Sequence, residues 1–186
     1  MASAAAPVLL IGGWTLAAAL QPRAFDSVSE SISALAGRDA SHRWVMTAAI
    51  LATGLCQLLT AFALRPARLA GRVVLFVGGL CTCLVALNPL PPAPQASTGH
   101  AVFATGTFLC LAAWPLASWR AGHDVSWALR RAVAVTAGCL LVSLTAWFFV
   151  ASLTDSDLLG LAERAAAGTQ NVWPFVVTLG AWRQTR

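Results

Sequence analysis

The chain has 186 residues, of which 58% are hydrophobic and only 10% are charged, and its formal net charge is +5. Such a composition leaves too little polar surface to cover a soluble globule, which excludes a soluble enzyme with a mere hydrophobic patch. All twelve basic residues are arginines in short loops beside apolar runs, where charges that set membrane topology lie, so the positive charge does not indicate nucleic-acid binding.

Six apolar runs are long enough, as helices, to cross a hydrocarbon core of about 30 Å. They cover residues 4–20, 44–64, 70–88, 98–118, 129–152 and 169–183. The first run lacks a basic segment before it, so we expect a retained helix and not a cleaved signal peptide. The sequence therefore predicts an all-α fold, a polytopic membrane bundle of about six transmembrane helices that forms a single domain over residues 1–186.

The first loop contains the pattern of a short amphipathic helix. Residues 27–30 match a capping box, apolar side chains recur at helical spacing at Val28, Ile32 and Leu35, and Gly37 provides a C-terminal stop. We expect this segment to form a helix on the outer membrane surface.

The fifth loop has a similar pattern, because Asp155 or Ser156 can cap a helix that ends at Gly168. We expect a second surface helix there. The third loop, residues 88–94, is rich in proline and uncharged, and it predicts a stiff, extended connection.

Charges segregate between the two sets of loops. Eight arginines belong to the second loop, the fourth loop and the C-terminal tail: Arg65, Arg68, Arg72, Arg120, Arg130, Arg131, Arg183 and Arg186. Six of the seven acids belong to the first and fifth loops: Asp26, Glu30, Asp39, Asp155, Asp157 and Glu163. The positive-inside rule predicts that both termini are cytoplasmic. The exclusive use of arginine and the abundance of alanine suggest a bacterium, and hence its inner (plasma) membrane.

Cysteine and histidine patterns do not indicate a metal or cofactor site. All five cysteines lie inside apolar runs, where they are predicted to be packing residues and not disulfides. A zinc site formed by His42, His100 and a carboxylate has little support, because the two histidines lack a characteristic spacing. No haem, flavin or nicotinamide motif is present, so we expect no cofactor and no metal.

Candidate functional residues gather at the predicted outer surface. His100 opens the fourth span and can exchange protons near neutral pH, and acidic partners are available at Glu163, Asp26 and Glu30. These four are the predicted catalytic residues. The predicted substrate-binding residues are Ser31, Ser33, Asn88, Phe103, Thr107, Arg164 and Asn171. In the alternative interpretations, His100 hydrogen-bonds a loop carbonyl, the serines satisfy backbone groups or face water, and Glu163 lies on a solvated helix.

Three motifs together carry a family resemblance. They are the serine-rich segment 29–37, His100 at the start of the fourth span, and the segment 160–164 before the sixth. In their order and spacing the chain resembles the bacterial six-helix family catalogued as domain of unknown function 998. The resemblance implies a fold and a set of outward-facing polar residues, but no established reaction. Residues 89–92 read Pro-Leu-Pro-Pro where relatives are expected to carry Phe-Pro and an acid, so a partner for His100 would have to come from Glu163 or the first loop.

Three functions are compatible with these features. The first is a membrane-embedded enzyme that performs acid–base chemistry, meaning hydrolysis, isomerisation or cyclisation, on a lipid or isoprenoid-like substrate at the outer leaflet. The second is a non-catalytic binding or assembly subunit, for which glycines on several helices permit close packing. Transport of a small solute is less favoured, because the predicted spans contain no charged residue at mid-membrane. The bilayer is the expected partner in each case, and the oligomeric state is left open.

Overall fold

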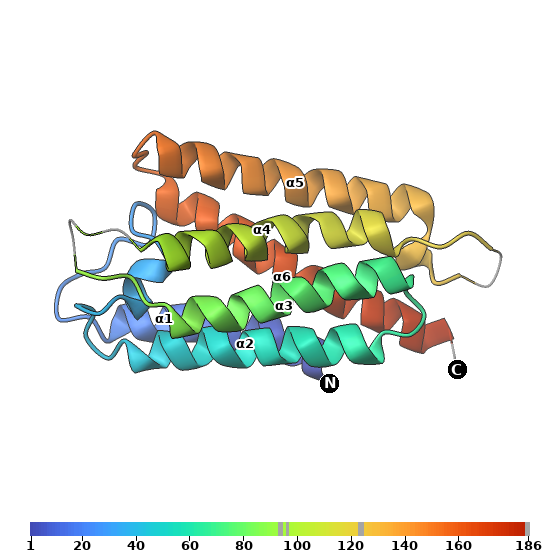
Figure 1. The fold of residues 1–186 in the computed structure, drawn as a ribbon, viewed down its shortest axis with the longest axis horizontal. Helices are drawn as coiled ribbons and strands as arrows, with labels where there is room; N and C mark the ends of the chain where they lie inside the picture. Colours follow the sequence, from blue (N-terminus) through green and yellow to red (C-terminus); the bar gives the residue numbers. More distant parts are fainter. Residues whose placement is uncertain (93–94, 96, 123–124, 185–186) are drawn as a thin grey trace.

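The protein is described by a computed structural model at residues 1–92, 95, 97–122 and 125–184. These residues form six α-helices and two short 3₁₀ turns, without a β-strand (Figure 1). The helices are α1 (Ala2–Ala19), α2 (Trp44–Ala63), α3 (Leu69–Leu87), α4 (Thr98–Ser118), α5 (Arg131–Leu153) and α6 (Leu159–Gln184), and the turns are η1 (Ser33–Ala36) and η2 (Trp127–Leu129). Ala93 and Pro94 of the predicted stiff loop, and Arg186 of the basic tail, lie outside the described residues.

The chain is a multi-pass helical membrane protein. Five helices, α1 to α5, are long and apolar enough to cross a membrane, and α6 lies along them in the same bundle (Figure 1). Large apolar side chains such as Leu59, Phe62 and Leu109 point away from the bundle. Such side chains are costly in water and favourable against lipid. The all-α, polytopic fold predicted from the sequence is therefore confirmed.

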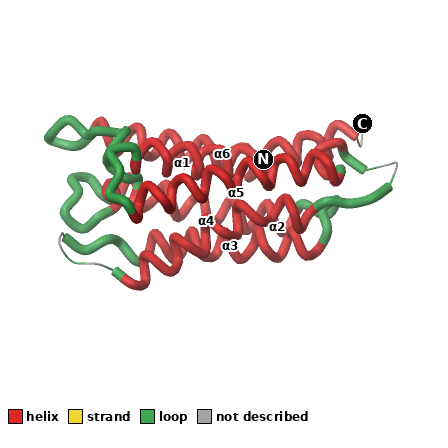
Figure 2. Tube along the Cα trace, turned by 90° about the horizontal axis from the view of Figure 1, so that it is seen from above, coloured by secondary structure: helices red, strands yellow, loops and turns green. Residues whose placement is uncertain are grey.

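The loops gather at two ends of the bundle. The first and fifth loops lie together at one end with the start of α4, and the α2–α3 and α4–α5 connections lie at the other end with the C-terminus (Figures 1 and 2). The acidic loops and the described residues of the basic loops are thus on opposite ends. Which end faces the cytoplasm stays a prediction.

Neither predicted surface helix forms as expected. The only helical segment of the first loop is the 3₁₀ turn η1. Asp26 and Glu30 bind nearby backbone groups and hold the residues before η1 in non-helical turns. The fifth loop is shorter than predicted, because α6 begins at Leu159 and runs through Gly168 without a stop. Gly168 faces the Trp14 ring of α1, so tertiary packing offsets the glycine's cost of about 1 kcal/mol in a helix.

Two apolar clusters hold the bundle. The first-loop cluster joins η1 to the helices around it and consists of Leu10, Ala17, Ile32, Leu35, Ala36, Val45, Met46, Ile50, Val85 and Ala86. The opposite-end cluster consists of Ala61, Leu64, Ala67, Leu75, Leu111, Trp114, Ala128, Leu129 and Val177. Polar side chains fill the space between them, and the candidate site lies there.

Candidate functional site in a cavity between the helices

A cavity of about 70 Å³ lies inside the bundle. Its polar lining consists of Ser33, Thr53, Gln57, Thr82, Thr107, Glu163, Gln170 and Asn171, and its apolar lining of Leu10, Ile32, Ile50, Val85, Ala104, Phe108, Leu111 and Ala167. One water needs about 10–15 Å³, whereas pockets that enclose a drug-sized ligand measure about 300–1,000 Å³. The cavity therefore has room for a few waters or for one small polar group.

Gln57 connects three helices at this cavity. Its amide nitrogen donates to the Asn171 side-chain oxygen at 2.9 Å, and its amide oxygen accepts from the Thr82 hydroxyl at 2.9 Å. The Thr82 and Thr107 hydroxyl oxygens are 3.4 Å apart, which brings α4 to the same group. Because a buried amide is costly unless it is paired, these bonds determine how α2, α3 and α6 are aligned around the cavity.

Gln170 is fully buried, and only its amide nitrogen has hydrogen-bond partners. Its amide nitrogen donates to the Phe108 carbonyl at 3.0 Å and to the Thr145 hydroxyl at 2.8 Å, and its amide oxygen has no hydrogen-bond partner. Exchanging the two amide atoms would place the oxygen against the Phe108 carbonyl, so the hydrogen bonds determine the amide orientation. The Gln170 amide oxygen is thus a buried acceptor without a partner in the protein.

Glu163 places a carboxyl group at the same cavity, with only 4% of the residue exposed. The backbone N–H of Ile32 donates to one carboxyl oxygen, and the Ser33 hydroxyl lies 3.4 Å from the other. Both donors come from the first loop at the turn η1. Two residues that lie 130 and 131 positions earlier in the chain therefore orient the carboxyl group, and no local pattern around Glu163 reveals these contacts.

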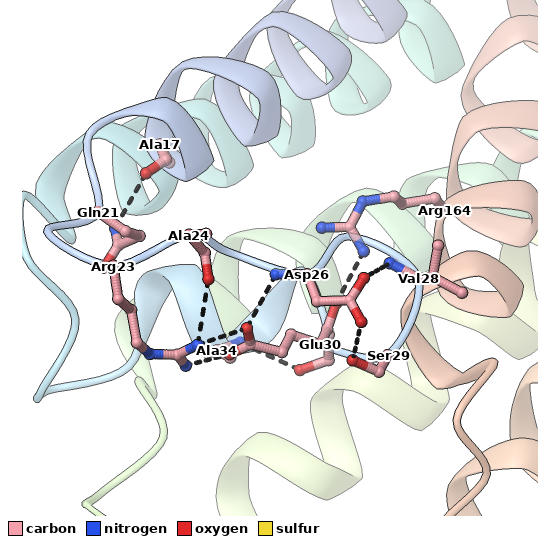
Figure 3. A network of polar contacts seen from close by, with 11 residues as sticks. Ala17, Gln21, Arg23, Ala24, Asp26, Val28, Ser29, Glu30, Ala34 and Arg164 are labelled. Atoms are coloured by element: carbon pink, nitrogen blue, oxygen red, sulfur yellow. Dashed lines mark hydrogen bonds and ion pairs between the residues drawn. The ribbon is translucent and has the colours of Figure 1, made fainter.

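Arg164 attaches the first loop to α6. Its Nη1 atom donates to the Glu30 carbonyl at 2.8 Å (Figure 3). The same atom donates to the Ser27 carbonyl at 2.9 Å, and the Leu161 N–H donates to the Val28 carbonyl at 2.9 Å. The guanidinium carbon also lies 5.6 Å from the centre of the Phe25 ring, within cation–π range. Arg164 therefore holds the loop by its backbone and does not line the cavity.

Asp26 and Glu30 of the first loop bind groups of the same loop. Glu30 forms an ion pair with Arg23 and accepts the Asp26 N–H at 3.0 Å, while Asp26 accepts the Val28 N–H and the Ser29 hydroxyl (Figure 3). The Ser29 hydrogen bond lowers the pKa of Asp26, and the hydrogen bond from Arg23 lowers the pKa of Glu30. Neither carboxyl group lines the cavity.

These pKa shifts predict that acid loosens the first loop. A carboxyl group whose pKa is lower in the folded state stabilises that state above its unfolded pKa of about 4, and it loses this effect as the pH falls through the folded value. A nitroxide at Val28→Cys, with the native cysteines replaced by alanine, should be equally immobile at pH 6 and 8 and more mobile below about pH 4. Electron paramagnetic resonance measures this change.

The Asp26→Asn, Glu30→Gln double variant is the control, since it removes both titrations and leaves Glu163. Its nitroxide should be mobile already at neutral pH and should change little on acidification. A wild-type loop that stays immobile well below pH 4 would contradict the role given to these acids.

His100 lies apart from the cavity lining. Its Nδ1 atom is 2.8 Å from the Asn88 carbonyl oxygen, and its backbone N–H donates to the Ser97 hydroxyl. The contact with a carbonyl places the proton on Nδ1 in the neutral ring, which leaves Nε2 as an acceptor. The geometry is that of the alternative interpretation, a histidine bound to a loop carbonyl.

Four predicted site residues meet at the cavity, namely Ser33, Thr107, Glu163 and Asn171. The other seven do not line it: His100, Asp26, Glu30, Ser31, Asn88, Phe103 and Arg164. Ser31 caps η1 by accepting the Ala34 N–H, and Phe103 packs on the first-loop cluster. The site selection from sequence missed Gln170 and left Gln57, Thr53 and Thr82 aside, although polar side chains inside apolar runs were a visible signal.

Within the part of the chain that the structure describes, no three His, Cys, Asp or Glu side chains lie close enough together to hold a metal ion. The five cysteines are free thiols. What the cavity offers chemically is therefore one carboxyl group, three amides and several hydroxyls.

Comparison with known proteins gives a family but no function. Residues 4–180 match the model of a family described as protein of unknown function (DUF998). No curated protein and no solved structure matches the chain.

Proposed function

The chain belongs to the DUF998 family, and for this member we propose a membrane-embedded enzyme that performs acid–base chemistry on a lipophilic substrate, with Glu163 as the group that exchanges the proton. The observation that carries the proposal is the buried carboxyl group of Glu163 at a cavity between the helices. General acid–base catalysis needs a carboxyl group held within reach of the reacting atom and shielded from bulk water. The bonds from Ile32 and Ser33 supply the first requirement, and burial supplies the second.

The role is assigned to Glu163 and not to His100, Asp26 or Glu30, because only Glu163 among the four lines the cavity. A lipophilic substrate fits the apolar half of the lining, which includes Leu10, Ile50 and Phe108, and it can reach the cavity from the lipid around the helices. Hydrolysis, isomerisation and cyclisation all use such a carboxyl group, and the proposal covers these three reaction types.

The opposite-end cluster favours a binding pocket over a path for solutes. Leu111 closes the cavity on that side, and Leu75, Trp114 and Val177 pack around it with almost no exposure. A solute would have to cross this apolar layer to leave the bundle at the opposite end. The segregation of arginines supports the additional proposal that this end is cytoplasmic, in the plasma membrane of a bacterium.

Lipid analysis of the native host tests the proposed enzyme. The gene is deleted and replaced by wild type, Glu163→Gln or Asp157→Asn, and lipophilic extracts are compared by mass spectrometry. We expect one defined species to accumulate in the deletion strain and with Glu163→Gln, because loss of a general acid–base group slows turnover about 10²–10⁴-fold. Wild type should restore the original profile.

Asp157→Asn is the matched control, since it makes an acid-to-amide change at an exposed residue of the α5–α6 connection. It should behave as wild type at equal protein level in the membrane. A Glu163→Gln strain with the wild-type lipid profile would remove Glu163 from the chemistry. A lipid that copurifies with the protein but is unchanged in every strain would instead support a non-catalytic binding subunit.

A further inference from the structure

A groove of about 380 Å³ lies between α5 and α6, which pack side by side along the bundle (Figure 1). Its lining is apolar and aromatic apart from two threonine hydroxyls, and it includes Trp127, Val133, Thr136, Leu140, Thr169 and Trp173. Leu140 is 53% exposed and Trp127 is 49% exposed, so the groove opens toward the surrounding lipid. It shares no lining residue with the cavity at Glu163.

The length of the groove matches one leaflet of a bilayer. On α5 it runs from Ala132, at the start of the helix, to Leu141, nine residues further along, which corresponds to about 14 Å. A hydrocarbon core is about 30 Å thick, so the groove covers about half of it. A lipid chain occupies one leaflet, whereas a helix of a partner protein would contact α5 and α6 across both. The length therefore favours a lipid chain as the occupant.

Two arginines lie at the end of the groove where the headgroup of such a lipid would be. Arg130 is the N-cap residue of α5 and stands in the sequence between two lining residues, Trp127 and Ala132. Arg183 lies in the last turn of α6, three residues after Gly180, where an added Cβ atom would be 3.1 Å from the Trp127 Nε1 atom. Both arginines are exposed, and neither guanidinium group has a hydrogen bond or ion pair with the part of the chain that the structure describes.

The net charge at this end of the bundle selects an anionic headgroup. The second loop, the fourth loop and the C-terminal tail contain eight arginines and one acid, Asp124, which lies outside the described residues. Arg72 and Arg120 donate to backbone carbonyls, and such contacts leave the positive charge in place. A zwitterionic headgroup gains little from an excess of positive charge, whereas each basic residue near the surface strengthens the binding of an anionic lipid.

From the length of the groove and the charge at its end we infer that it binds an anionic phospholipid, with one acyl chain between α5 and α6 and the phosphate at Arg130 and Arg183. A guanidinium group is well matched to a phosphate, because its N–H groups can bond two oxygens at once. Trp127 lies between the two parts of the lipid, where indole rings favour the membrane interface. The inference goes beyond the proposed function and does not depend on it.

Photolabelling in nanodiscs tests the inference with the wild-type chain. The nanodiscs consist of phosphatidylcholine with a trace of either phosphatidylglycerol or phosphatidylcholine that carries a diazirine in one acyl chain. We expect the phosphatidylglycerol probe to label residues 127–141 and 169–173 about five- to thirtyfold more than the phosphatidylcholine probe, as one or two arginines near an anionic lipid predict. Both leaflets contain the probe, so the result does not depend on which end of the bundle is cytoplasmic.

Charge variants locate the headgroup. Arg130→Gln combined with Arg183→Gln should reduce the preference for phosphatidylglycerol to less than about threefold. Arg65→Gln combined with Arg68→Gln is the matched control, since it removes the same charge from the α2–α3 connection at the same end. The control should keep the preference within about twofold of the wild-type value.

Variants of α5 locate the acyl chain. Thr136→Phe places a ring in the groove and should reduce labelling by the phosphatidylglycerol probe at least about threefold. Val135→Phe adds the same ring at the neighbouring exposed residue, which does not line the groove, and should leave the labelling unchanged.

Equal labelling by the two lipids would overturn the inference, as would labelling spread evenly over all exposed helices. Equal effects of the two charge variants would also overturn it, because the preference would then belong to the whole end of the bundle and not to this groove. Crosslinks between two copies of the chain in place of lipid labelling would assign the groove to a second copy. The comparison of the two lipids uses the wild-type chain alone, so it remains decisive if a variant does not fold.

Discussion

Gly160→Ala should lower the free energy of unfolding by about 2–3 kcal/mol, the cost typical of forcing extra atoms into a packed site. A Cβ atom at this position would overlap the Glu30 carbonyl oxygen and would lie 2.8 Å from the Ser27 carbonyl oxygen. Both oxygens accept from Arg164, so moving them also removes the bonds that hold the first loop on α6. Equilibrium unfolding in mixed micelles measures the change.

Gly12→Ala provides the matched control, because a Cβ atom there has no other group within 4 Å. The same substitution in open space should leave stability unchanged or raise it by about 1 kcal/mol through helix propensity. Hydrogen exchange should show faster exchange of residues 27–36 in Gly160→Ala and no change there in Gly12→Ala. Equal effects from the two variants would mean that the close approach of the loop to α6 does not stabilise the protein.

Gln57→Leu should also destabilise the protein, by about 1–2 kcal/mol, because it removes two side-chain hydrogen bonds and leaves the Asn171 side-chain oxygen without its donor. The partners are Asn171 on α6 and Thr82 on α3, both buried. Leucine has a similar volume, so the loss reports hydrogen bonding more than packing. Thermal and mixed-micelle unfolding should both detect it.

A double-mutant cycle separates this bond from general disruption. Gln57→Leu combined with Asn171→Leu should cost less than the sum of the single variants, since each single change already removes the shared hydrogen bond. Thr60→Val, which deletes a buried hydroxyl that bonds only within α2, should cost less than about 1 kcal/mol. Additive costs for Gln57 and Asn171 would exclude a stabilising bond between them.

Apolar runs predicted the fold well, because membrane-spanning helices are defined by length and composition. The predicted spans 44–64, 70–88 and 98–118 each agree within one residue per end with α2, α3 and α4. In lipid every backbone group must be paired within its own helix, so a long apolar run has few alternatives. The tertiary contacts of such a run matter little for its identity as a helix.

Helix boundaries in the polar segments were predicted less well. Gly168 reads as a stop signal, yet α6 continues through it, and the capping pattern at residues 27–30 does not start a surface helix. Both signals are local preferences of about 1 kcal/mol. The contact of α6 with Trp14, and the attachment of the first loop by Arg164, outweigh preferences of that size.

The candidate site, too, was predicted only in part from the sequence. Ser33, Thr107, Glu163 and Asn171 were predicted as part of a polar site at the outer membrane surface, and the fold brings these four to one cavity. Whether His100 and Asp26 reach this cavity depends on which face of their helix or loop is covered by another segment. The unpaired oxygen of Gln170 depends on two partners 25 and 62 residues away in sequence.

By itself, then, the sequence determined that this is a helical membrane protein, roughly where its spans lie, and which loops carry acid or arginine. These properties follow from transfer of whole segments between water and lipid, a free energy that sums over the residues of each segment. Only the tertiary structure decided that Glu163 faces a cavity, that Arg164 holds the first loop, and that His100 lies apart. Those outcomes depend on hydrogen bonds between residues up to 137 positions apart, and the geometry of such bonds exists only once the helices are packed.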